Sequence, residues 1–351
     1  MTRRKSSRRR GRRRAQPWWV DLPTDDLLSV RLCDLELEIE GSPLEPRIIR
    51  LEDDLARAGL RFRPKIWLST DWFSPEGVAG FALPFFLAHP KLARLERQHM
   101  LQVEGGNHRW CLQLLRHETG HAIDSAYRLR RRRRWREKFG RAGRPYRASY
   151  VPNPDSRRFV HHLPDFYAQS HPCEDFAETF AVWVGPGARW RSLYAGWPAL
   201  RKLEYVDELM SEIAERVPAA RSRERTDSLS TLRMTLRDYY LRKEEHYGRE
   251  DLTVYDHELG RLFSDDAAHR RRKSAAAFLR ERRNELVRVV ARWTGQHRYT
   301  VDEVLRGMIL RARDRRLRLA ASERETAEGA AVVAALHAAE IERMRHREYF
   351  R

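Results

Sequence analysis

Apolar residues recur at helical and strand-like spacing in the first part of the chain. Leu51 and Leu55 lie one turn apart and predict a helix over 45–58, because residues four apart share one face of a helix. The run KIWLS at 65–69 is typical of a short strand. The segment 72–90 is rich in Gly, Pro and aromatic residues, so we expect an irregular apolar stretch that lines a cleft.

A strand, a glycine turn and a long helix are predicted next. The run HMLQVE at 99–104 can form a strand that ends at a Gly-Gly turn. Asn107 is a suitable N-cap for a helix that continues through Tyr127 and reaches Phe139 at its longest. Two further helices are predicted, over 172–184 and in the region 197–217.

The last third of the chain is charge-dense and keeps helical spacing of its apolar residues. One helix is indicated by Leu279, Leu286, Val290 and Trp293. Thr300 and Glu303 have the spacing of a capping box, which predicts the start of another helix. We therefore expect 218–351 to be a helical C-terminal region that packs on the preceding core or gates its cleft.

The composition describes a basic protein with room for more than one hydrophobic core. A chain of 351 residues with 41% apolar residues can bury one large core, with a second core or an appendage beside it. Residues 1–16 are nearly all Arg, Lys, Ser and Gly and predict a disordered tail, which leaves 17–217 as the main globular domain. The net charge of +19 favours contact with polyanions, but it specifies no chemistry.

Cysteine usage and hydropathy bear on the cellular location. Cys33, Cys111 and Cys173 are too few and too scattered for a disulfide framework or a cysteine-based zinc site, and they fit a reducing compartment. The basic N-terminus is not followed by the apolar run of a secretory signal. The longest apolar stretch, 77–88, contains Pro84 and is too short to cross a bilayer. These features predict a cytoplasmic protein without a membrane span.

Candidate chemistry is concentrated in the sequence His-Glu-Thr-Gly-His at 117–121. On a helix, His117 and His121 lie one turn apart on one face, where two imidazoles can hold one Zn²⁺. Glu118 can then polarise a metal-bound water and accept its proton. A hydrolytic zinc site takes a third protein ligand and leaves one position for water.

The third ligand is expected in the segment 171–178, where Glu174 and Glu178 lie one helical turn apart. One of these carboxylates can bind the metal while the other orients a histidine. Asp124, one turn beyond His121, is either a ligand or a hydrogen-bond acceptor. The acceptor role is favoured, because three ligands on one straight helix rarely converge on a single ion.

Three sequence blocks carry a resemblance to a known family: LRHETGHAIDSAYRL, YAQSHPCEDFAETFAVW and YAGWPALRKLEYVDELM. They resemble the putative zinc-binding metallopeptidases, a bacterial gluzincin-like family, over about residues 25–215. The resemblance implies an α+β, zincin-like catalytic domain, predominantly helical with a small mixed sheet. It also implies that Glu174, the first glutamate of E-x-x-A-E, is the metal ligand and that Glu178 is its second-shell partner. Tyr167, two turns ahead of that ligand, is then the expected oxyanion donor.

The function that follows is hydrolysis of a peptide or protein substrate by a zinc-bound water that Glu118 activates. Tyr167 meets the developing oxyanion, and the free edge of the strand predicted over 99–104 pairs with the extended substrate. This hypothesis makes the chain a zinc metallopeptidase, with Zn²⁺ as its cofactor.

Two arginine runs, Arg8–Arg14 and Arg130–Arg134, support a different hypothesis. They can bind phosphate backbones without sequence preference, which is typical of a nucleic-acid-associated protein with a structural or vestigial zinc site. The internal run reads more simply as a solvated face, whereas the tail has no packing role. A third hypothesis is a hydrolase with another substrate on the same scaffold. The peptidase hypothesis is preferred, because a structural site has no use for Glu118 and is usually closed by a fourth Cys or His.

Overall fold

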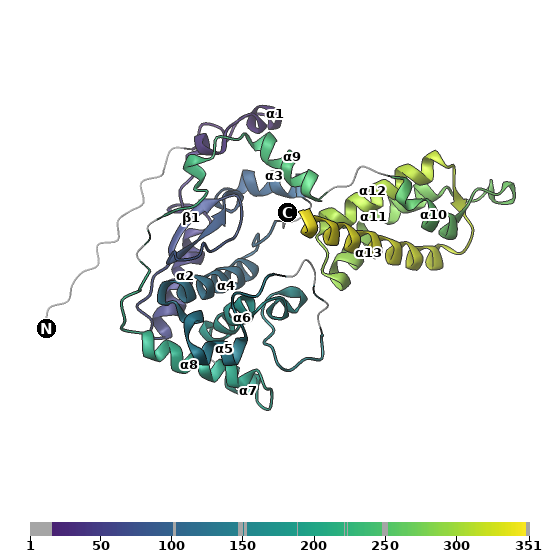
Figure 1. Ribbon diagram of the computed structural model, residues 1–351. Coiled ribbons are helices and arrows are strands. Elements are labelled where there is room, and N and C mark those ends of the chain that lie inside the picture. The colour runs from purple at the N-terminus through teal and green to yellow at the C-terminus, as the bar shows by residue number, and fades with distance from the viewer. Residues whose placement is uncertain are drawn as a thin grey trace.

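A computed structural model of the chain shows two lobes, each with its own hydrophobic core (Figure 1). The structure describes residues 16–100, 103–146, 150, 153–187, 189–220, 222, 224–247 and 252–348. The arginine tail predicted over 1–16 therefore lies outside the described residues, apart from its last position. No helix in the described ranges is long and apolar enough to cross a membrane.

The first lobe consists mainly of helices packed around a two-stranded parallel sheet, in agreement with an α+β fold that is mostly helical. The sheet pairs β1 (Lys65–Ser69) with β2 (Gly80–Pro84). The longer helices of this lobe are α2 (Glu45–Arg57), α3 (Pro90–Met100), α4 (His108–Tyr127), α6 (Pro172–Val184), α8 (Leu200–Ile213) and α9 (Leu236–Tyr247). The predicted helix over 45–58 and the strand at 65–69 are confirmed.

The strand predicted over 99–104 is wrong. His99 and Met100 end helix α3, residues 101–102 are outside the description, and Val103 and Glu104 lead into a turn. Burial explains the difference, because α3 packs Leu92, Leu95 and Met100 into the core from one helical face. The described residues of this segment therefore form no strand edge with which a substrate could pair.

Strand β2 lies within the segment 72–90 that we expected to be irregular. All five of its residues are buried, so no alternation of polar and apolar residues marks it as a strand. Gly80 faces Lys65 of β1 so closely that a Cβ atom would lie 2.2 Å from the Lys65 carbonyl oxygen. Phe81 and Phe85 belong to the hydrophobic core, whereas Trp72 lines a cleft described below.

Helices α4 and α6 cross at the centre of the first lobe. Asn107 caps α4 as predicted, since its side chain accepts a hydrogen bond from the Trp110 amide at 2.9 Å. The helix ends at Tyr127 because Arg128 adopts a left-handed conformation (φ 53°), and a separate helix α5 (Arg133–Phe139) follows. A Cβ atom on Gly120 would lie 2.8 Å from the Ala177 Cα, so this glycine allows the close approach of α4 and α6.

The second lobe is a bundle of four helices: α10 (Asp256–Leu262), α11 (Ala275–Thr294), α12 (Arg298–Asp314) and α13 (Glu323–Glu348). Strand β3 (Phe263–Ser264), which follows α10, pairs antiparallel with β4 (Arg318–Leu319), which lies between α12 and α13. The N-cap of α12 is His297, whose side chain accepts from the Tyr299 amide, so the predicted capping box at Thr300 is wrong. Trp293 is 78% exposed, although its spacing predicted a core position.

The change from the first core to the second lies later in the sequence than the domain boundary predicted at 217. The first core includes Leu236, Tyr239 and Tyr240, and the second begins at Tyr255. The region after 217 first returns to the first lobe, where α9 packs beside α3 (Figure 1). We propose moving the boundary between the lobes to the segment between 240 and 255.

Candidate metal centre

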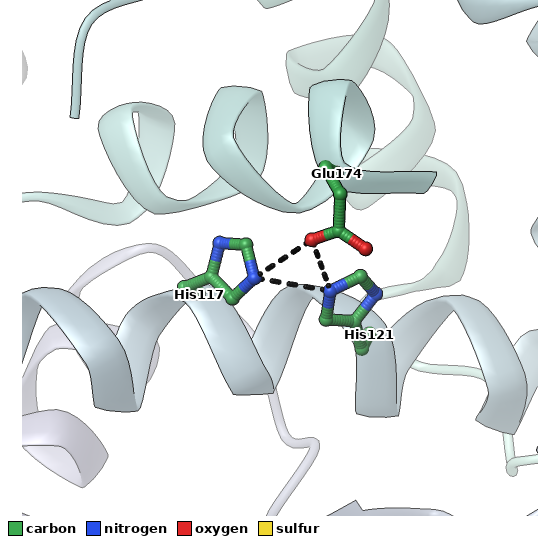
Figure 2. Close-up of side chains that lie close together, drawn as sticks. All are labelled: His117, His121 and Glu174. Carbon is green, nitrogen blue, oxygen red and sulfur yellow. Dashed lines mark hydrogen bonds and ion pairs between the residues drawn. The ribbon is translucent and has the colours of Figure 1, made fainter. Parts of the chain in front are cut away.

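Helices α4 and α6 bring together two histidines and one glutamate (Figure 2). His117 and His121 lie one turn apart on α4, and their Nε2 atoms are 3.1 Å from each other. Glu174, from the first turn of α6, places Oε2 3.1 Å from His117 Nε2 and 3.0 Å from His121 Nε2. Three metal-binding atoms therefore converge on one point between the helices.

The spacing of these atoms fits a zinc ion. Tetrahedral zinc bound at about 2.0–2.1 Å places its ligand atoms roughly 3.4 Å apart, close to the 3.0–3.1 Å observed for all three pairs. Two imidazole nitrogens and one carboxylate oxygen are also the ligand types that zinc prefers. His117, His121 and Glu174 can thus hold the ion as three protein ligands.

Glu178 contacts the ring nitrogen of His117 that faces away from the cluster. Its Oε1 lies 2.8 Å from His117 Nδ1, and its Oε2 accepts a hydrogen bond from the Leu163 amide at 2.8 Å. A proton on Nδ1, donated to Glu178, leaves the lone pair of Nε2 facing the centre of the cluster. Glu178 is fully buried, so few competing partners are available to it.

The electrostatics of the cluster reflect its close packing. Burial alone would lower the pKa of His117, but hydrogen bonds to Glu174 and Glu178 outweigh it and hold that pKa well above 6.5. Burial likewise opposes ionisation of Glu174, yet the two histidines hold its pKa well below 4.5. The carboxylates of Glu174 and Glu178 thus favour positive charge between the helices, as they would favour a bound cation.

Glu118 follows the first histidine and lines a cleft of about 780 Å³ between the two lobes. The wall from the first lobe also contains His117, Trp72 and Tyr167. The C-terminal lobe supplies the opposite wall from α11, α12 and the turn between them: Arg288, Ala291, Arg292, Gly295, Gln296, His297 and Arg298. Burial raises the pKa of Glu118 above its usual range, and the neighbouring histidines oppose this rise.

Two tyrosines approach the cluster, and only one of them was predicted. The ring of Tyr167, in the 3-10 helix η4 (Pro164–Gln169), lies 5.7 Å from the His117 ring. The Tyr146 hydroxyl donates to Glu174 Oε1 at 2.6 Å, and its ring stacks on His171 at 3.8 Å. Burial and then the charge of Glu174 raise the pKa of both phenols, so both remain hydrogen-bond donors.

Sequence reasoning missed Tyr146 because it lies in a loop 28 positions before Glu174, outside any recognisable spacing. Tyr146 is also 46% exposed, so no apolar pattern marks it. Its ring stacks on His171, the N-cap residue of α6, and its hydroxyl contacts Glu174 of the same helix.

Asp124 is bound by Arg130 and lies outside the cluster. Its Oδ1 accepts from the Arg130 amide at 2.8 Å, and its Oδ2 accepts from Arg130 Nε at 2.7 Å. Of the described residues, only His117, His121 and Glu174 form a group with the spacing of a metal site. Cys33, Cys111 and Cys173 form no disulfide and do not belong to this group.

Comparison with known proteins agrees with this region of the chain. The family described as "Putative zinc-binding metallo-peptidase" matches residues 92–185, which include α4, α6 and all three candidate ligands. The resemblance stated from the sequence is thus confirmed for this segment. No curated protein and no solved structure matches the chain.

Proposed function

We propose that this chain is a zinc metallopeptidase of the gluzincin type, with a zincin-like catalytic lobe that hydrolyses peptide bonds. The observation that carries the proposal is the convergence of His117, His121 and Glu174 beside the buried carboxyl of Glu118. Three protein ligands leave one coordination position open, as hydrolytic zinc sites require. The cleft in front of Glu118 offers room for a polypeptide segment.

A bound zinc ion would lower the pKa of a water molecule toward 7 and polarise the scissile carbonyl. Glu118 accepts a proton from the attacking water and later donates it to the leaving nitrogen, so that the C–N bond breaks into a carboxylate and an amine. Burial raises its pKa, so its carboxylate is a stronger base toward the proton of the attacking water.

The surrounding residues have supporting roles in this proposal. Tyr167 remains protonated and lines the cleft, so it can donate a hydrogen bond to the developing oxyanion. Tyr146 positions Glu174, and Glu178 positions His117. Asp124 anchors the turn after α4 by accepting hydrogen bonds from the amide and side chain of Arg130.

The other hypotheses have less support. A structural zinc site is usually closed by a fourth Cys or His, whereas the group found among the described residues has three members. A hydrolase with another substrate would use the same ligands, and the family description favours a peptide. The unbonded cysteines fit the proposed cytoplasmic location, and polyanion contact through the arginine tail stays a prediction.

The proposal is tested by comparing wild type, Glu118→Gln and Glu174→Ala. Each protein is stripped of metal, reloaded with zinc, analysed for metal content and incubated with a peptide library whose products are identified by mass spectrometry. We expect wild type to hold one zinc and cleave, Glu118→Gln to hold zinc without cleaving, and Glu174→Ala to lose both. Cleavage by Glu118→Gln at the wild-type rate would overturn the proposal.

A further inference from the structure

A groove lined by arginines lies on the surface of the first lobe, apart from the cleft between the lobes. It has a volume of about 1120 Å³ and is formed by the start of α5 and the loop that follows it. We call it the arginine groove, after its lining residues Arg130, Arg131, Arg133, Arg136, Arg141 and Arg144. Glu137 is the only carboxylate among its lining residues, so the groove carries a strong positive charge.

Most of this charge is not neutralised within the protein. Arg130 pairs with Asp124, and Arg133 pairs with Glu137. Four arginines of the groove form no ion pair with any described residue: Arg131, Arg136, Arg141 and Arg144. All four are exposed. Clustered like charges repel one another, so an anionic partner would relieve that repulsion.

The chain segment 144–146 connects the groove to the metal centre. The Arg144 carbonyl oxygen accepts a hydrogen bond from His171 Nε2 at 2.7 Å. Two residues later, the Tyr146 hydroxyl donates to Glu174. Two residues span about 7 Å at most, and the Tyr146 side chain with its hydrogen bond to Glu174 adds roughly 9 Å. The groove therefore begins within roughly 16 Å of Glu174, the length of about five extended residues.

We propose that the arginine groove binds acidic side chains of the peptide substrate, within about five residues of the bond that is cut. This inference rests on the proposed peptidase function and assigns its substrate class. The position of the groove favours a peptide, because its lining residues Arg144 and Pro145 directly precede Tyr146, whose hydroxyl contacts Glu174. Its described lining contains no aromatic residue on which a nucleic-acid base could stack.

The test compares cleavage by wild type, by the groove variant Arg136→Ala/Arg141→Ala and by a control, Arg270→Ala/Arg280→Ala. The control removes the same charge from exposed positions of the C-terminal lobe, remote from the groove. Cleavage sites are first mapped on a peptide library. The best-cleaved sequence is then synthesised in two forms, with Asp or with Asn at positions three to five from the cut.

We expect wild type to cleave the Asp peptide with the higher kcat/KM. The groove variant should lose about fivefold on the Asp peptide, as expected for two exposed ion pairs, and nothing on the Asn peptide. The control should match wild type on both peptides, and 0.5 M salt should remove the preference.

Three results would overturn the inference. Cleavage of the two peptides at equal rates by wild type overturns it while the peptidase function stands. Tighter binding of a single-stranded oligonucleotide than of an Asp-rich peptide of equal charge, lost in the groove variant, assigns the groove to nucleic acid instead. Failure to cleave any peptide with zinc bound overturns the proposed function, and this inference with it.

Discussion

Replacing Glu178 with glutamine should weaken zinc binding although Glu178 is not a ligand. Each of its carboxylate oxygens accepts one hydrogen bond, from His117 Nδ1 and from the Leu163 amide, both at 2.8 Å. A glutamine has one oxygen and one NH₂ group, so in either orientation the NH₂ group faces a donor. The substitution keeps the size of the side chain and removes one of the two bonds.

The size of the effect follows from the bond that is lost. A hydrogen bond to a charged group contributes about 1.5–3 kcal/mol, and more is lost when a buried donor is left without a partner. Since 1.4 kcal/mol corresponds to a factor of ten, zinc affinity should fall by about 10- to 100-fold. The loss of zinc arises because His117 is no longer held with Nε2 toward the cluster.

The assay is a competition titration against a chromophoric zinc chelator, with the folded fraction measured in parallel. Glu96→Gln is the matched control, because Glu96 is also a buried glutamate, held by Lys243 of α9. We expect the control to bind zinc within about twofold of wild type. An unchanged zinc affinity in Glu178→Gln would refute the assignment of Glu178 as the residue that orients His117.

Three further predictions concern helices α4 and α6 and the loop residue Tyr146, which contacts Glu174. Gly120→Ala places a Cβ atom 2.8 Å from the Ala177 Cα, so urea unfolding should show a loss of about 1–3 kcal/mol; unchanged stability would mean that α4 and α6 separate easily. Tyr146→Phe removes the bond to Glu174 and should lower zinc affinity by about tenfold in a chelator titration, whereas an effect on kcat alone would make this hydroxyl a transition-state donor. Burial raises the pKa of Asp175 from 3.8 to about 7. The folded state therefore binds this proton more tightly, and the free energy of unfolding contributed by this group falls as pH rises from about 4 to about 7. Denaturation curves between about pH 4 and about pH 7 should show that Asp175→Asn removes this fall in the free energy of unfolding. An unchanged pH dependence would mean that the pKa of Asp175 is not raised in the folded state.

The sequence could predict the parts of the site that depend on local spacing. Helical periodicity places His117 and His121 on one face, and Asn107 marks the start of their helix. Glu174 and Glu178 share a face of α6 for the same reason. Which of the two contacts the Nε2 atoms of both histidines depends on how α6 crosses α4, so the choice of Glu174 as the ligand needed the family resemblance.

Features set by long-range packing were not predictable in the same way. Strand β2 is buried on both faces and so lacks the alternation that identifies strands. Met100 is apolar in a strand or a helix alike, and only the core contacts of α3 decide between them. Tyr146 reaches Glu174 from a loop, and the C-terminal lobe reaches the cleft with Arg292 and Arg298 from positions far along the chain.

The zinc centre itself is tested most directly by anomalous diffraction at the zinc edge, on crystals of the full chain grown with zinc. We predict one strong anomalous peak bonded to His117 Nε2, His121 Nε2 and Glu174 Oε2, the three atoms that converge in the structure. A strong peak bound by other residues, or no peak between these three side chains at saturating zinc, would contradict the assignment.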